Sequence, residues 1–132
     1  MKKNYKEYVV YAGTEFIIEW FYNDNGKSQA KKYFDDLDRT QKIDAFELFK
    51  TMANIGKILN ITKFRCEGEG IFAFKPKPNR FLCFFFSGKK IIITNAFEKK
   101  KDKLSQPEKQ KASSHKDDYE TRVKQGEYYE KE

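Results

Sequence analysis

Hydrophobic residues in the first half of the chain recur at helical spacing in two segments. Ser28 can cap a helix N-terminus, and after it the apolar residues follow the i, i+3, i+4, i+7 spacing of one helix face. These residues are Ala30, Tyr33, Phe34 and Leu37. Residues 38–40 can cap a second helix that ends at Gly56 and has the same spacing. Its apolar residues are Ala45, Leu48, Phe49 and Met52. The short connection predicts a helical hairpin.

Short runs of β-branched and aromatic residues predict the strands. Residues 16–22 form a first run, which the turn-forming residues 23–26 end, and the preceding run at 8–11 either extends this strand or pairs separately. Three further strands are predicted at residues 71–75, 80–87 and 90–94. The connection Ser87-Gly88-Lys89 suits a hairpin, so these strands form an antiparallel meander. Its middle strand is apolar on both faces and should be central, with helices covering one side.

A third helix is predicted near the C-terminal end. Ser105 and Glu108 form a capping box around Pro107, and residues Ala112, Tyr119 and Val123 follow as its inward positions. Residues 124–132 are polar and are expected to be a frayed tail. The element order β-α-α-β-β-β-α predicts an α+β fold with helices packed on a small sheet. We expect one domain over residues 1–132, with a core at about residues 14–123.

Length and composition also indicate one folded domain. The 132 residues are 39% hydrophobic and 17% aromatic, which predicts a single, aromatic-rich core. Cys66 and Cys83 lack CxxC spacing and the chain has one His, so we expect free thiols, no metal site and no other cofactor. Met1 is followed by no apolar leader, and no run reaches the roughly 18 apolar residues of a membrane span. A cytoplasmic protein without a membrane partner is expected.

The basic charge is concentrated in one segment. The chain has 27 Lys and Arg against 20 Asp and Glu, a formal net charge of +7. Residues 57–104 hold 12 of the basic and 4 of the acidic residues, which leaves 15 and 16 for the rest. Such a local surplus predicts binding to a polyanion, because each neutralised phosphate releases counterions. The alternative interpretation is a solubilising face without a ligand.

Two basic clusters flank the predicted meander. One lies between its first two strands and the other follows its last strand. Their members are Lys75, Lys77 and Arg80, and Lys99, Lys100, Lys101 and Lys103. If both clusters lie in one groove, the groove suits metal-free RNA cleavage, in which the 2′-OH attacks the adjacent phosphate and cations neutralise the developing charge. Crowded cations lower one another's pKa, so one of residues 99–101 is a candidate general base.

Side chains that could stack on a base or carry a proton are also candidates for the site. Phe97 and Arg80 can stack on an unpaired base, although Phe97 also suits a core position at the strand end. His115 is the only imidazole and is a candidate proton carrier if the last helix borders the groove. The alternative for His115 is a solvated helix residue.

A succession of motifs between residues 70 and 112 is similar to a known family. A strand ends in Lys75, an aromatic strand begins at Asn79-Arg80, a strand exit reads Phe97-Glu98-Lys99-Lys100, and a helix starts at Pro107-Glu108. This succession resembles the RelE/ParE superfamily of toxins, and within it the HigB-like, phage-derived branch. In element order the resemblance extends over about residues 14–123.

The resemblance implies a RelE-like fold, in which a small, mainly antiparallel sheet carries an N-terminal helical hairpin and a C-terminal helix. It also implies the toxin of a type II toxin–antitoxin system that cleaves mRNA on the ribosome without a metal. The expected partners are the ribosome, mRNA and a cognate antitoxin, expected to be a helix-turn-helix protein. Carried over by position, the catalytic residues are Lys75, Arg80, Lys99 and Lys100. The RNA-binding candidates beside them are Lys77, Phe97, Lys101 and Lys103.

The sequence departs from this family at one motif. Many HigB-like members have a His where this chain has Asn95-Ala96-Phe97, and no Tyr follows where RelE itself uses one. This departure leaves the general acid and base unassigned. Two alternative functions therefore stay open: a ParE-like toxin that inhibits gyrase without nuclease chemistry, and an inactive, toxin-derived nucleic-acid-binding protein.

Overall fold

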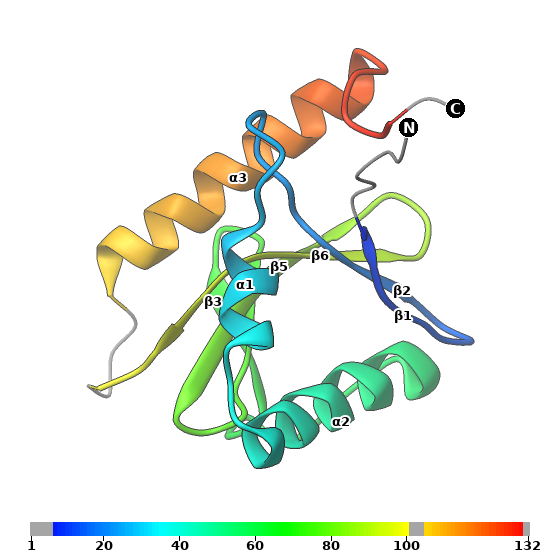
Figure 1. The fold of residues 1–132 in the computed structure, drawn as a ribbon. Coiled ribbons are helices and arrows are strands. Elements are labelled where there is room, and N and C mark those ends of the chain that lie inside the picture. Colours follow the sequence, from blue (N-terminus) through cyan, green and yellow to red (C-terminus); the bar gives the residue numbers. More distant parts are fainter. Residues whose placement is uncertain (1–6, 101–104, 131–132) are drawn as a thin grey trace, which may run out of the picture.

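The computed structural model describes residues 7–100 and 105–130, which form a six-stranded sheet with helices on both faces (Figure 1). The strands are β1 (Val9–Ala12), β2 (Ile17–Trp20), β3 (Phe64–Gly68), β4 (Ile71–Phe74), β5 (Asn79–Phe86) and β6 (Lys90–Glu98). The helices are α1 (Gln29–Asp35), α2 (Arg39–Ile55) and α3 (Gln106–Lys124). The order in the sheet is β1-β2-β6-β5-β4-β3, in which β2 and β6 are parallel and the other neighbours antiparallel.

The helices begin and end where the sequence predicts caps. The side chain of Ser28 accepts a hydrogen bond from the Lys31 amide at the start of α1, and Asp38 accepts one from Gln41 at the start of α2. Helix α2 ends at Gly56, whose φ of 88° is readily adopted by glycine. Helix α1 is shorter than the predicted segment 28–37, and the two predicted helices are confirmed as consecutive helices with a short connection.

The sheet separates two apolar cores. Helices α1 and α2 cover one face, where Trp20, Phe49 and Phe81 pack together, and α3 covers the other, where Phe84 and Tyr119 are buried. Strand β5 alternates between the two cores and has neighbours on both edges, so its predicted central position is confirmed. The expectation that helices cover only one side of it is wrong, because α3 packs on the second face.

The observed order is β-β-α-α-β-β-β-β-α, two strands more than predicted. The run at residues 8–11, left open by the sequence, forms the separate strand β1. Strand β3 was missed because only Phe64 and Cys66 of its five residues are apolar and none is β-branched, and it is an edge strand that pairs only with β4. The α+β class is confirmed.

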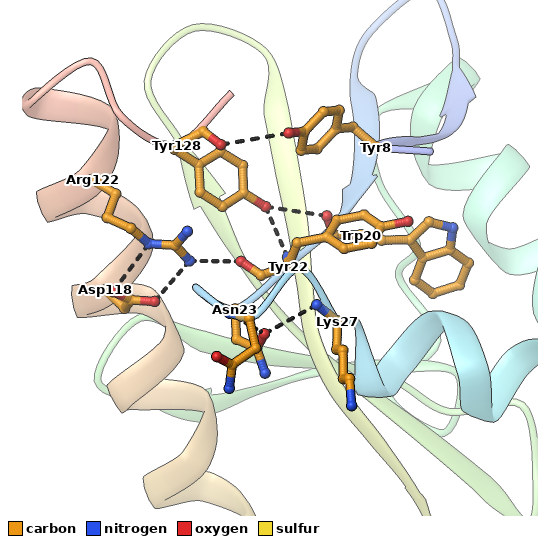
Figure 2. A network of polar contacts seen from close by, with 9 residues as sticks. Tyr8, Trp20, Tyr22, Asn23, Lys27, Asp118, Arg122 and Tyr128 are labelled. Atoms are coloured by element: carbon orange, nitrogen blue, oxygen red, sulfur yellow. Dashed lines mark hydrogen bonds and ion pairs between the residues drawn. The ribbon is translucent and has the colours of Figure 1, made fainter. Parts of the chain in front are cut away.

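The predicted frayed tail is wrong for residues 125–130, which follow α3 and are described by the structure. The side chain of Tyr128 is only 3% exposed, and its hydroxyl accepts a hydrogen bond of 2.9 Å from the Tyr22 amide (Figure 2). Arg122 of α3 donates to the Tyr22 carbonyl at 2.6 Å and also binds Asp118. Tyr8 contacts the Tyr128 carbonyl from the β1 side. The core therefore extends beyond residues 14–123 at both ends.

Candidate anion-binding site

Three strand ends meet at one end of the sheet and form a pocket of about 400 Å³. Lys75 follows β4, Arg80 is the second residue of β5, and Lys99 follows β6. The pocket is lined by Thr62, Lys75, Lys77, Pro78, Arg80, Lys99 and Lys100. Five of these residues are cationic and none is acidic, so the pocket favours an anion. The structure thus brings together all four predicted catalytic residues and the predicted RNA-binding Lys77.

Backbone pairing fixes the geometry of this pocket. The antiparallel register places Arg80 opposite Phe97, so the start of β5 lies beside the end of β6. The Lys99 amide donates to the Pro78 carbonyl at 2.8 Å, and the Lys75 amide donates to the Lys63 carbonyl at 2.8 Å. Lys75 and Lys99 are therefore held on ordered backbone, which reduces the conformational entropy lost when a ligand binds.

The Lys75 side chain lies in an environment that disfavours its charge. Its pKa is lowered, first by partial burial and then by the positive charge of Arg80, with a further contribution from Lys99, and Glu67 opposes the effect. Its Nζ donates to the Ile61 carbonyl at 3.1 Å. The sequence placed the candidate base among residues 99–101, whereas a lowered pKa is found at Lys75.

Arg80 presents unused hydrogen-bonding capacity. Its Nη1 donates to the Asn79 carbonyl at 3.0 Å, which orients the guanidinium group. Its Nε is buried and has no hydrogen-bond partner among the described residues. Burial lowers the Arg80 pKa, but guanidinium stays charged at neutral pH. An oxyanion in the pocket would match the planar geometry of the guanidinium N–H donors.

Helix α1 supports the pocket from the opposite face of the sheet, through residues that the sequence analysis missed. Tyr33 donates its hydroxyl to the Asn79 side chain, and Asn79 is only 2% exposed. The side chain of Gln29 pairs with both backbone groups of Ala96, at 2.7 and 2.8 Å. These contacts join α1 to the first residue of β5 and the end of β6. No local sequence pattern predicts these contacts, because each joins residues that are far apart in the sequence.

Other predicted site residues lie elsewhere. Phe97 is half-buried and packs against the core under α3, which agrees with its alternative interpretation as a core residue, and it does not line the pocket. His115 does not line the pocket either, and its ring stacks on Phe21 with a centroid distance of 4.6 Å. Lys101 and Lys103 lie outside the described residues.

The Asn95 position, where the sequence departs from the HigB-like pattern, has a structural role. Asn95 is 1% exposed, and its Nδ2 donates to the carbonyl and carboxylate of Glu108 at 3.1 and 3.0 Å. Its Oδ1 accepts from the Thr94 hydroxyl. These contacts attach the first turn of α3 to β6, and they use both donor hydrogens of the Asn95 side chain.

The partial burial of His115 predicts a pH-dependent stability. Burial lowers its pKa, which Asp118 opposes, while Lys111 and Arg122 lower it further. The unfolded chain, with a His pKa near 6.5, therefore takes up a proton more readily as the pH falls from about 7 to about 5. The free energy of unfolding should decrease over this range, and less so in His115→Phe, which keeps the ring contact. Urea unfolding at both pH values measures the difference, and equal losses in the two proteins would contradict it.

Within residues 7–100 and 105–130, no group of three His, Cys, Asp or Glu side chains could hold a metal ion. Cys66 is exposed and Cys83 buried, and both are free thiols. No helix in the same ranges is long and apolar enough to span a membrane.

The sequence matches a known protein family. The family described as phage derived protein Gp49-like (DUF891) matches residues 27–117, which include both N-terminal helices, the meander and the first half of α3. All five cationic residues of the pocket lie within this match. A search of curated proteins found no match.

Proposed function

This chain belongs to the Gp49-like family of phage-derived proteins, and we propose that it is the toxin of a type II toxin–antitoxin pair that cleaves mRNA on the ribosome. The observation that carries the proposal is the pocket of five cations at the meeting point of three strand ends. We extend the proposal to the wider relationship, in which this family is a HigB-like branch of the RelE/ParE superfamily.

The pocket suits RNA cleavage by the substrate's own 2′-OH. In this reaction the 2′-oxygen bonds to the adjacent phosphorus while a base takes its proton, and the bond from phosphorus to the 5′-oxygen breaks as that oxygen takes a proton from an acid or from water. The products are a 2′,3′-cyclic phosphate and a free 5′-hydroxyl. Arg80, Lys99 and Lys100 would neutralise the charge that develops on the phosphorane oxygens. Lys75 is our candidate for the base, because its lowered pKa makes the neutral amine more accessible.

The proposed partners are those that the resemblance to RelE/ParE toxins implies. The chain would act in the cytoplasm on mRNA held by the ribosome, where the polyanionic substrate meets the surplus charge of residues 57–104. The proposed antitoxin is a helix-turn-helix protein encoded beside this chain. A cofactor is not required by the proposed reaction.

The experiment that tests the proposal is induction of the chain in a bacterial host, followed by primer extension on abundant mRNAs. We expect cuts within translated codons, and we expect Lys75→Met to weaken them about tenfold or more. The matched control is Lys89→Met, which removes the same charge from the exposed hairpin turn at the opposite end of β5 and β6. It should cut as the unmodified chain does.

The other outcomes separate the alternatives. Growth arrest without cuts would favour a gyrase-directed toxin over a nuclease. Neither arrest nor cuts, together with retained RNA binding, would favour an inactive binding protein. Equal loss of cuts in Lys75→Met and Lys89→Met would show that overall charge, rather than the pocket, determines activity.

A further inference from the structure

The turn that leads into β3 exposes two large aliphatic side chains beside the pocket. Leu59 is 81% exposed and Ile61 is 66% exposed, the highest values for large hydrophobic residues in the described part of the chain. The neighbouring Ile58 packs against the core instead. We call Leu59 and Ile61 the aliphatic lip. Single exposed hydrophobic residues are common, but two at this exposure on one turn are a candidate binding surface.

Hydrogen bonds hold the lip in a fixed conformation. The Asn60 side chain accepts from the amide and the hydroxyl of Thr62 at 2.9 and 2.7 Å. The Asn60 carbonyl accepts from the amides of Lys63 and Phe64 at 2.9 and 3.1 Å. The turn is therefore ordered before any partner arrives, so burial of the lip is opposed by little loss of backbone entropy.

The lip adjoins the cationic pocket directly. Thr62, the residue after Ile61, lines the pocket. The Nζ of Lys75 donates to the carbonyl of Ile61 at 3.1 Å. A polypeptide that covers Ile61 would therefore also reach the mouth of the pocket and the side chain of Lys75.

We propose that the aliphatic lip is a docking surface for an acidic, amphipathic polypeptide segment, which binds its apolar side chains to the lip and its carboxylates to the pocket and so blocks the pocket. This proposal rests on the proposed function, because it takes the blocked pocket to be the RNA-binding site. It adds the surface through which that site is regulated and the chemistry of the partner.

Two observations favour a polypeptide over RNA at the lip. RNA bases are held by aromatic or guanidinium faces, and the branched side chains of Leu59 and Ile61 offer no flat face for stacking. Aliphatic side chains gain most from contact with other apolar side chains, as in helix-in-groove recognition.

The charges around the lip define the partner further. Lys57 and Lys63 are exposed on the same segment, and the five cations of the pocket lie next to it. A neighbouring hollow beside α2 is lined by Asp44 and Glu47 as well as by Lys63 and Lys77, so its charges balance, whereas no acidic residue lines the pocket. The segment is therefore directed toward the pocket rather than toward α2.

The test is competition between peptides and RNA for the full chain. A fluorescein-labelled single-stranded RNA oligonucleotide reports binding by anisotropy. The probe is a 20-residue peptide with Leu at i, i+3, i+4 and i+7 and Glu at most other positions, and its control has every Leu replaced by Ser at equal charge. We expect the Leu peptide to displace RNA at about tenfold lower concentration than the Ser peptide.

Two double variants test whether the difference between the Leu and Ser peptides depends on the lip. In Leu59→Ser/Ile61→Ser the tenfold advantage of the Leu peptide should disappear while RNA binding is unchanged. The matched control, Val9→Ser/Ile43→Ser, removes two other exposed hydrophobic side chains, 53% and 50% exposed, and should keep the advantage.

The outcomes separate this proposal from the proposed function. Equal displacement by the two peptides, or an unchanged advantage in the lip variant, would overturn the docking surface and leave RNA binding intact. Loss of RNA binding in the lip variant would assign the lip to RNA and also overturn it. If the chain binds no RNA, the proposed function fails, and direct binding of the labelled Leu peptide still tests the lip.

Discussion

Replacing Arg80 with Met is expected to lower the rate of RNA cleavage by about 10²–10³-fold, the usual loss when one donor to a developing oxyanion is removed. Arg80 is oriented by the Asn79 carbonyl and retains a buried Nε without a partner among the described residues. Arg80→Lys should restore little of the rate, because an ammonium group lacks the planar pair of donors that fits a phosphate. Single-turnover cleavage on programmed ribosomes measures both variants.

The control for this prediction is Arg39→Met. Arg39 is exposed at the start of α2 and does not line the pocket, so its replacement removes the same side chain without affecting the site. Its cleavage rate should equal that of the unmodified chain. An Arg80→Met protein that unfolds normally and still cleaves at the original rate would exclude a role for Arg80 in the reaction.

Phe49→Ala is expected to cause the largest loss of stability, about 3–5 kcal/mol. The Phe49 ring is fully buried on α2 and makes edge contacts with Trp20, Phe74 and Phe81, so truncation leaves a cavity between α2 and the sheet. The midpoint of urea unfolding should fall by more than about 1 M.

The matched control for Phe49→Ala is Phe85→Ala. Phe85 lies on the same sheet but is 37% exposed, and its contacts are with the half-buried rings of Phe16, Phe64 and Phe72. Its truncation removes the same atoms and should lower the free energy of unfolding clearly less, because water already reaches the ring. Equal costs at the two positions would contradict the assignment of the core.

Much of the fold could be predicted because local patterns encode it. The caps at Ser28 and Asp38 and the stop at Gly56 depend on hydrogen bonds within a few residues, so the sequence alone located the helix ends. The central position of β5 followed from a run that is apolar on both faces. Strand β3 could not be found in this way, because an edge strand with one covered face carries few apolar residues.

The candidate site could also be predicted only in part from the sequence. The sequence by itself determined which segment carries the basic charge and which residues form its two clusters, because charge is a property of composition. Only the tertiary structure decided that Lys75, Arg80 and Lys99 share one pocket, since antiparallel pairing joins strand ends that are distant in sequence.

Some assignments depended on neighbours that no local pattern reveals. The pKa of Lys75 is lowered by burial and by cations from other strands, so the residue with a perturbed pKa could not be identified from its own segment. His115 and Tyr128 read as polar surface residues in sequence, yet the structure stacks one on Phe21 and buries the other beside Tyr22. The sequence determined most of the elements and the charge that they carry. Long-range packing decided which side chains meet, because the burial of a side chain and the electrostatic field around it are set by its neighbours in space.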